Sequence, residues 1–239
     1  MVCRRQAVEE MSEAAFIKLK SQRVLSGTVP NNESKHIPIG GIMSKSQQQS
    51  ILQLKVTLCQ IKPPIWRRIL VPDNITLGQL HDVLQIVMGW TDSHFHQFVL
   101  GREVYGVPDE DEDNFMFGTP LKDENKERVS SLLLKEKDSL TYEYDFGDGW
   151  QHKVTLEKII PYDSSIQLPS CIKGKRACPP EDCGGVWGYV ELLEIMSDKS
   201  HPEYNERLEW LETDFAPEYF DHAEVNAQLL MEIGPGTLR

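Results

Sequence analysis

Apolar and polar side chains alternate over residues 52–58, and this period of two predicts a half-buried β-strand. A Pro-Pro pair at 63–64 interrupts the pattern, and the apolar stretch at 65–71 predicts a second strand. Residues 94–100 alternate again and predict a third. Strands therefore dominate the first part of the regular pattern.

The period changes to that of a helix after Thr76. Apolar residues recur three and four positions apart between Leu77 and Val87. Thr76 and Gln79 have the spacing of a capping box, and Gly89 can supply the C-terminal stop. The sequence thus predicts an amphipathic helix between Thr76 and Gly89.

A glycine-rich turn inside residues 140–160 predicts an antiparallel hairpin. A two-residue turn would set Asp145 opposite His152, but it would pair apolar with charged residues along the strands. A three-residue loop at 147–149 sets Tyr144 opposite His152 and keeps the apolar positions on one face. We therefore expect His152 on the packed aromatic side and Asp145 on the other face.

Helical spacing returns near the C-terminus, at 189–197, 202–211 and 223–231. Because helices and antiparallel strand signals intermix, we predict an α+β fold, a single-domain roll of mostly antiparallel strands with helices packed on it. The expected boundaries are a flexible N-terminal extension at 1–46, the domain at 47–233 and a C-terminal tail at 234–239.

The extension is predicted from composition, because residues 21–41 are rich in Ser, Gly, Pro and Asn. Met43 would also serve as a start, so residues 1–42 are expected to be either a dispensable leader or a mis-assigned start. Acidic residues interrupt the basic ones near the N-terminus, and no apolar run approaches the roughly 18 residues of a membrane span. We expect a cytoplasmic protein with neither a secretory signal nor a membrane segment.

Charge is distributed unevenly along the chain, whose net charge is -12. Residues 1–46 hold seven Lys and Arg against four Asp and Glu, so the remainder holds 18 against 33. Affinity for a phosphate backbone rests largely on Lys and Arg. Bulk binding of nucleic acid is therefore disfavoured, and any such contact would need a local basic patch.

Three of the five cysteines follow the hairpin, at Cys171, Cys178 and Cys183. An odd number of cysteines disfavours a disulfide framework. Zinc is the ion that these three thiolates would hold, with His152 as the fourth ligand. Two alternatives stay open, namely thiols that pack without metal and a reactive thiol whose pKa the basic residues at 173–176 depress.

Candidate binding residues surround the hairpin and the cysteine loop. His94 and His96 share a strand face and can chelate a metal with a carboxylate, although such a pair is also ordinary at a polar strand edge. Gly184 and Gly185 run into a helix that could cradle a phosphate, but the acids before them oppose an anion. The candidate binding set is His94, His96, Tyr144, Asp145, Asp148, Trp150, His152, Gly184 and Gly185.

Several motifs together carry a family resemblance. They are Ile65-Trp66-Arg67-Arg68, His94 to Phe98, Tyr144 to His152, Ala177 to Gly185 with Gly188-Tyr189, and His201-Pro202-Glu203 with Phe220-Asp221 and Val225-Asn226. With these motifs the chain resembles the plasmid pRiA4b ORF-3-like family over roughly residues 50–231. The resemblance implies a compact α+β roll and an association of some members with plasmids and mobile elements. It implies no particular activity.

Two functional hypotheses follow. The first is a binding or interaction module, associated with mobile elements, for a protein, peptide or nucleic-acid partner. The second is a metal-dependent enzyme of hydrolase type, in which His94, His96 or His152 and nearby carboxylates hold an ion that activates water. The first is preferred because the sequence assembles no set of nucleophile, base and oxyanion donors.

Overall fold

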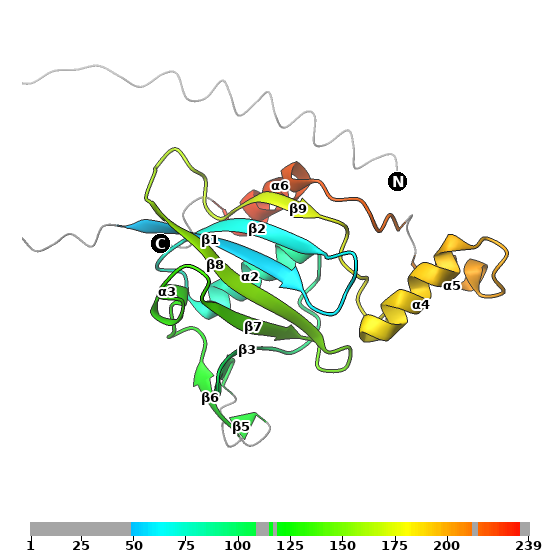
Figure 1. Ribbon diagram of the computed structural model, residues 1–239, viewed down its shortest axis with the longest axis horizontal. Helices are drawn as coiled ribbons and strands as arrows, with labels where there is room; N and C mark the ends of the chain where they lie inside the picture. The colour runs from blue at the N-terminus through cyan, green and yellow to red at the C-terminus, as the bar shows by residue number, and fades with distance from the viewer. Residues whose placement is uncertain (1–48, 109–114, 117–118, 212–214, 235–239) are drawn as a thin grey trace, which may run out of the picture. The chain divides into compact units, whose positions relative to one another are not determined.

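Strands and helices are intermixed along the chain, and the last three elements are helices (Figure 1). The computed structural model describes residues 49–108, 115–116, 119–211 and 215–234. The extension predicted at 1–46 lies outside these residues, as does the predicted tail except for Gly234. Residues Lys45–Arg239 group into one unit.

The described residues contain nine strands, which form one sheet in the order β5-β6-β4-β3-β7-β8-β1-β2-β9. The strands are β1 (Ser50–Leu58), β2 (Trp66–Pro72), β3 (His96–Leu100), β4 (Glu103–Gly106), β5 (Phe115–Met116), β6 (Thr119–Asp123), β7 (Ser139–Tyr144), β8 (Trp150–Pro161) and β9 (Ser170–Lys175). Only β4 and β6 pair in parallel within this sheet, and every other pairing is antiparallel. The predicted α+β class with a mostly antiparallel sheet is confirmed.

The helices of the described part are α2 (Leu77–Met88), α3 (Val129–Leu132), α4 (Gly185–Ser197), α5 (Tyr204–Trp210) and α6 (His222–Glu232). In Figure 1, α2 lies behind the sheet and α6 lies beside β9. No helix among the described residues is both long enough and apolar enough to cross a membrane.

Helix α2 forms as its sequence predicts. The Thr76 hydroxyl accepts a hydrogen bond from the Gln79 amide at 3.2 Å, and the Gln79 side chain accepts one from the Thr76 amide at 3.0 Å. Gly89 ends the helix with φ of 90° and donates its N–H to the Gln85 carbonyl. The apolar stripe of α2 is fully buried, so the helix supplies much of the core under the sheet.

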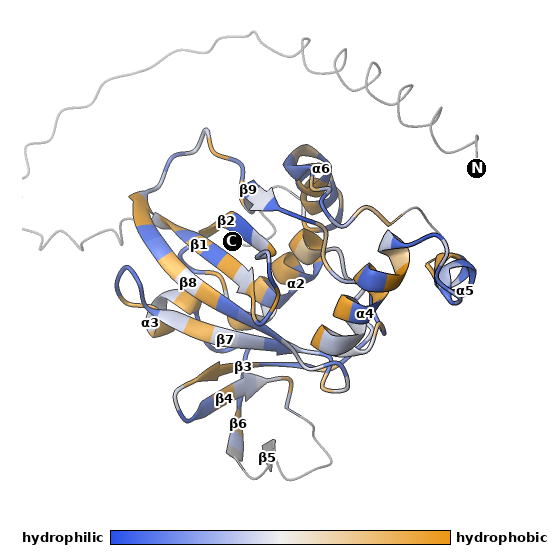
Figure 2. Cartoon of the chain, turned by 45° about the vertical axis from the view of Figure 1, so that its right-hand side comes forward, coloured by the Kyte–Doolittle hydropathy of each residue, from blue (hydrophilic) through white to orange (hydrophobic). Residues whose placement is uncertain are grey.

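The strands of the sheet are amphipathic, as their alternation predicts. Hydrophobic and hydrophilic residues alternate along β8 and β1 in Figure 2. In β1, Leu54 and Val56 are fully buried, whereas Lys55 and Thr57, which alternate with them, are partly exposed. One face of these strands therefore packs against the helices and the other is polar.

The hairpin between β7 and β8 has neither of the two predicted registers. Tyr144 pairs with Trp150 and Tyr142 with His152, so the loop is residues 145–149. Asp145 leaves the strand with φ of 53°, and its carboxylate accepts hydrogen bonds from amides inside the loop. Because the shift from the preferred register is two residues, the predicted packed face of His152 is retained while its partner is not.

Candidate functional site

Three loops meet at the end of the hairpin, namely residues 90–95, 145–149 and 179–185. The Tyr144 hydroxyl donates to Glu181 Oε1 at 2.6 Å and accepts from the Ser93 amide at 3.0 Å. Burial raises the pKa of Tyr144, and the bond to Glu181 raises it further. The hairpin end therefore contacts both the segment 90–95 and the cysteine loop at 179–185, and the shared contact is Tyr144 rather than His152.

Asp148 and the glycine pair make the second contact of this junction. The Gly184 amide donates to Asp148 Oδ2 at 3.2 Å. A Cβ atom at Gly185, where φ is 67°, would clash with the Asp148 carbonyl oxygen. The two glycines thus permit the start of α4 to pack closely against the hairpin loop. The Gly184 amide, which a phosphate bound at the N-terminus of the helix would need as a donor, is already bonded to the Asp148 carboxylate.

His94 lies at the junction between two carboxylates. Its Nε2 atom is 3.3 Å from Asp182 Oδ1 and 3.8 Å from Asp145 Oδ2. The ligand atoms of these three side chains all lie within 4.8 Å of one another. Asp182 is well exposed, however, and Asp145 already accepts two loop amides. The binding roles predicted for these residues stay predictions.

His152 is fully buried, and burial lowers its pKa to about 3. Its Nδ1 atom lies 3.3 Å from the Tyr142 carbonyl, and its ring meets that of Trp90 edge-on. Trp150 is also buried, and its ring centre lies 6.2 Å from that of Trp90 with the two rings tilted by 31°. Trp150 and His152, which were both predicted as binding residues, therefore lie in the hydrophobic core and are not accessible from solvent.

The cysteines and His152 do not come together as a zinc site. Among the described residues, two groups of ligating side chains lie close enough to hold an ion, and neither includes a cysteine. Burial raises the pKa of both Cys178 and Cys183 to about 12. Burial also raises the pKa of Cys171, which is inaccessible to solvent. The thiols therefore fit the packing alternative better than a reactive thiol.

The second group of ligating side chains was missed from the sequence, except for His96. It consists of His81, Asp92 and His96, whose ligand atoms lie within 4.8 Å of one another. His94 and His96 are consequently divided between two groups, because β3 begins only at His96. A signal did exist, since His81 follows Leu77 by four positions on the buried stripe of α2.

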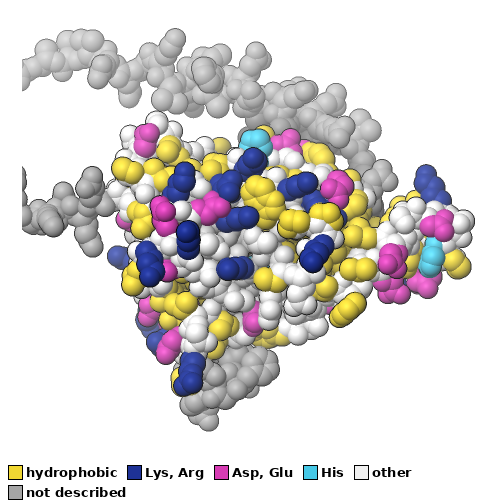
Figure 3. All heavy atoms as spheres, in the orientation of Figure 1, with side chains coloured by type: hydrophobic (Ala, Val, Ile, Leu, Met, Phe, Trp, Pro, Cys, Tyr) yellow, Lys and Arg dark blue, Asp and Glu magenta, His cyan; other side chains and the backbone are white. Residues whose placement is uncertain are grey.

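The polar face of the sheet carries a concentration of positive charge. Two rows cross the strands in the order β8-β1-β2-β9, and they are Thr155-Lys55-Arg68-Lys173 and Lys153-Thr57-Trp66-Lys175. Arg67 points to the opposite face, where its guanidinium stacks on Phe220 at 4.0 Å. In Figure 3, Lys and Arg side chains gather over these strands. We call these eight residues the basic rows.

Trp66 lies inside the basic rows. Lys55 Nζ is 5.2 Å and Arg68 Cζ is 5.4 Å from the centre of its ring. Arg68 is also held by Glu157, through bonds of 2.5 and 2.8 Å. Lys153, Lys173 and Lys175 are exposed. An aromatic ring and several exposed cations therefore share one surface.

The chain is similar to a described protein family, to a bacterial protein and to a solved structure. A family model described as plasmid pRiA4b ORF-3-like protein matches residues 50–224. The chain belongs to this family. An uncharacterized protein y4hQ of Sinorhizobium fredii is 39% identical over 162 residues, which are 67% of this chain and 80% of that protein. The crystal structure of MM3350, a protein of unknown function from Methanosarcina mazei Go1, has 41% identity and a TM-score of 0.66. This match covers 74% of the present chain and 97% of MM3350.

The pRiA4b ORF-3-like match includes every side chain of the loop junction, of the two histidine and carboxylate groups and of the basic rows. The family thus agrees with the resemblance carried by the sequence motifs. What these surfaces do has to be argued from their geometry.

Proposed function

We propose that this protein is a binding module for single-stranded nucleic acid, and that the basic rows are its contact surface. The observation that supports this proposal most is the placement of five Lys and Arg residues and Trp66 on one face of four adjacent strands. Phosphates are bound mainly by such cations. Sequence-tolerant binding of single strands also uses aromatic side chains on which bases stack.

The shape of the surface favours a single strand over a duplex. Adjacent strands lie about 4.8 Å apart, so each basic row spans about 14 Å of a nearly flat face. A flat sheet does not enter the groove of a duplex as a helix does, whereas unpaired bases can lie on it. A single strand is therefore the polymer that can contact cations and the ring at once.

The acidity of the rest of the protein does not oppose this proposal. Residues after 46 hold 18 Lys and Arg against 33 Asp and Glu, so the cations of the basic rows form a local exception. Repulsion elsewhere would confine a polyanion to this face. A nucleic-acid partner would also suit the association with plasmids that the family description carries.

The test is a titration of fluorescein-labelled oligo-dT and oligo-rU of about 20 nucleotides, followed by fluorescence anisotropy. Among the residues that the structure describes, the four lysines of the rows have no acidic partner of the kind that Arg68 has, so we expect a slope of about -3 for log affinity against log salt. The double variant Lys153→Glu/Lys175→Glu should bind at least about tenfold more weakly, with a flatter salt slope. Comparison of the two oligomers distinguishes DNA from RNA.

The matched control is Lys135→Glu/Lys199→Glu, which makes the same change of charge at exposed lysines outside the rows. It should keep the affinity of the unaltered protein within about threefold. Equal weakening by both double variants would refute the assignment to the rows. Absence of binding at low salt, equally tight binding of a duplex, or equally tight binding of poly-glutamate would refute a single-stranded nucleic acid as the ligand.

A second candidate function is the metal-dependent enzyme of hydrolase type. It is favoured by one observation, the placement of His94 between the Asp145 and Asp182 carboxylates. Catalytic metal centres combine three protein ligands with an open position for water or substrate. Hydrolytic activity that requires added metal and is lost in Asp182→Asn would support this candidate.

A further inference from the structure

The Nε2 atom of His94 is buried and has no hydrogen-bond partner among the residues that the structure describes. Two carboxylates nevertheless lie beside it, with Asp182 Oδ1 at 3.3 Å and Asp145 Oδ2 at 3.8 Å. A protonated ring nitrogen in an ordinary ion pair points at one oxygen and bonds to it. The axis of this nitrogen misses both oxygens, as it does in a ligand of an ion that lies between them.

The separations of the three side chains suit ligands of one ion. Ligands at about 2.1 Å from an ion in tetrahedral geometry lie about 3.4 Å from one another. The distances of 3.3 and 3.8 Å from the imidazole nitrogen lie on either side of this value. The three ligand atoms together lie within 4.8 Å of one another. A small adjustment of the Asp145 carboxylate therefore completes the geometry.

Asp145 presents one oxygen to this space while the hairpin loop holds the other. Its Oδ1 atom accepts hydrogen bonds from the Gly147 amide at 2.9 Å and the Asp148 amide at 3.3 Å. The side chain is only 9% exposed, so loop amides take the place of water at Oδ1. Carboxylates that ligate metals are hydrogen-bonded in this way by the groups around them. Oδ2 is the oxygen left for an ion.

The three loops of the junction concentrate negative charge. Their five carboxylates belong to Asp92, Asp145, Asp148, Glu181 and Asp182. Residues 90–95, 145–149 and 179–185 contain no Lys or Arg, so His94 is the one side chain of these loops that can carry positive charge. Carboxylates that share a site repel one another, and a bound cation is the largest local charge of such a site. A divalent ion would offset this repulsion more fully than an imidazolium does.

The site combines buried ligands with access to solvent. The side chains of His94 and Asp145 are 28% and 9% exposed, whereas that of Asp182 is 71% exposed. A cavity of about 410 Å³ adjoins the two less exposed residues, with Phe95 and Phe146 also in its lining. An ion would thus be held from inside by two ligands and from the rim by the third. The cavity leaves room for water at the remaining positions.

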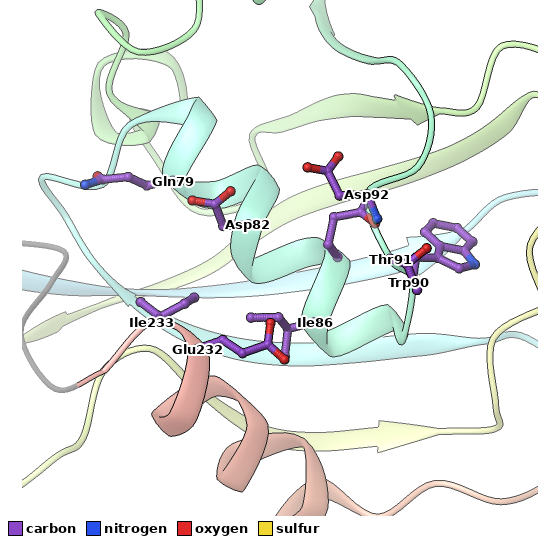
Figure 4. A pocket seen from close by; sticks show the side chains of 9 residues that line it. Gln79, Asp82, Ile86, Trp90, Thr91, Asp92, Glu232 and Ile233 are labelled. Atoms are coloured by element: carbon purple, nitrogen blue, oxygen red, sulfur yellow. The ribbon is translucent and has the colours of Figure 1, made fainter.

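Two other groups of acidic and polar residues suit an ion less well. The His81 and His96 rings stack face to face at 3.5 Å, so the lone pairs of their nitrogens run parallel and do not converge. His81 Nε2 is moreover bonded to Asp92 at 2.9 Å. The cavity of about 420 Å³ in Figure 4 is lined by Asp82 and Glu232, but no imidazole is among its described lining residues.

We propose that His94, Asp145 and Asp182 bind one divalent transition-metal ion, with water at its remaining positions. One imidazole and two carboxylates suit Mn²⁺ or Zn²⁺, whereas Ca²⁺ and Mg²⁺ prefer oxygen ligands alone. The site depends on the loop junction and not on the basic rows. It could serve the hydrolase candidate, but its occupancy is measured by binding and does not depend on hydrolysis.

The test uses the full chain purified without a polyhistidine tag and stripped of metal with a chelator. Titration with Mn²⁺, followed by the loss of the electron paramagnetic resonance signal of the free ion, should find one ion per chain. Titration calorimetry should find the same stoichiometry with Zn²⁺, and bound metal should raise the melting temperature. In nuclear magnetic resonance spectra, Mn²⁺ should first broaden the amide signals of residues 90–95, 145–149 and 179–185.

Asp182→Asn alters a largely exposed side chain and should weaken binding by at least about tenfold. The matched control is Glu232→Gln, which removes an exposed carboxylate at the cavity of Figure 4 and should keep the affinity within about threefold. Circular dichroism verifies the fold of each variant.

Three results would overturn the proposal. The folded protein could take up no metal, or Asp182→Asn could bind the ion as tightly as the unaltered protein. Alternatively, several weakly bound ions per chain could be lost equally in Asp182→Asn and Glu232→Gln, which would indicate general attraction to the acidic surface. The first result would leave His94 and its two carboxylates as a loose ion pair.

Discussion

The hydroxyl of Tyr144 lies 2.6 Å from Glu181 Oε1, and this contact ties the end of strand β7 to the cysteine loop. Thr91 donates to the same carboxylate through its amide and its hydroxyl. Burial alone would raise the pKa of Glu181, but the hydrogen bonds from Thr91 and Tyr144 together lower it. Glu181 is therefore the residue through which the three loops of the junction are joined.

Replacing Tyr144 by Phe should destabilise the protein by about 1 to 3 kcal/mol, because the half-buried Glu181 carboxylate loses a charge-assisted hydrogen bond from the buried Tyr144 hydroxyl. The measurement is urea unfolding followed by circular dichroism. Tyr162→Phe is the control, since Tyr162 is 49% exposed and should change stability by less than about 0.5 kcal/mol. Equal effects of the two substitutions would contradict the role of the junction.

The sequence pattern correctly predicted those elements that are determined by interactions between residues close together in the sequence. The capping box of Thr76 and Gln79 set the start of α2, and Gly89 set its end. The alternation around Lys55 likewise defined which side of β1 faces the core. Neither inference required knowledge of any distant residue.

The functional geometry depends on distant residues, and it could not be predicted in the same way. Alternation correctly placed His152 on the packed face, yet the loop length failed because the Asp145 carboxylate stabilises a loop that no pairing rule anticipates. His96 was found, but its partners Glu124 and His81 come from separate segments. The basic rows similarly appear only when four strands are aligned.

Gly185→Ala should cost more stability than Gly101→Ala. Both glycines have positive φ, at 67° and 62°, so each substitution carries a strain of about 1 to 2 kcal/mol. Only at Gly185 would the new Cβ also clash, with the Asp148 carbonyl, whereas nothing lies within 4 Å at Gly101. Urea unfolding of the two variants isolates the clash as their difference. Equal losses would show that the hairpin loop can move away from α4.

The thiols of Cys178 and Cys183 should react slowly with iodoacetamide in the folded protein. With pKa values of about 12, both are almost wholly protonated at neutral pH. Alkylation should be at least about a hundredfold slower than in the urea-unfolded chain, as measured by mass spectrometry of peptides. Repeating the measurement after chelation separates burial from zinc binding. If burial alone protects the thiols, alkylation should stay slow after chelation. Alkylation that becomes fast once the chelator is added would instead support the cysteine zinc site.

His152 should make stability depend on pH in the acid range. Its pKa falls from the ordinary value of 6.5 to about 3 on folding, so the unfolded chain binds more protons between these two values. The stabilising contribution is complete above pH 6.5 and is lost progressively as the pH falls toward 3. Near pH 4.5 the loss should reach about 2 to 3 kcal/mol.

His152→Phe removes the titrating group from the core and isolates this contribution. Carboxylates also titrate below about pH 5, so the informative quantity is the difference between the variant and the unaltered protein at each pH. Urea unfolding should show that the variant loses less stability on acidification, whatever its stability at neutral pH. His222→Gln, at an exposed position of α6, should leave the acid dependence unchanged. Identical pH profiles for His152→Phe and the unaltered protein would mean that His152 is protonated in the folded state, and its burial against the Tyr142 carbonyl would then require a buried counter-charge.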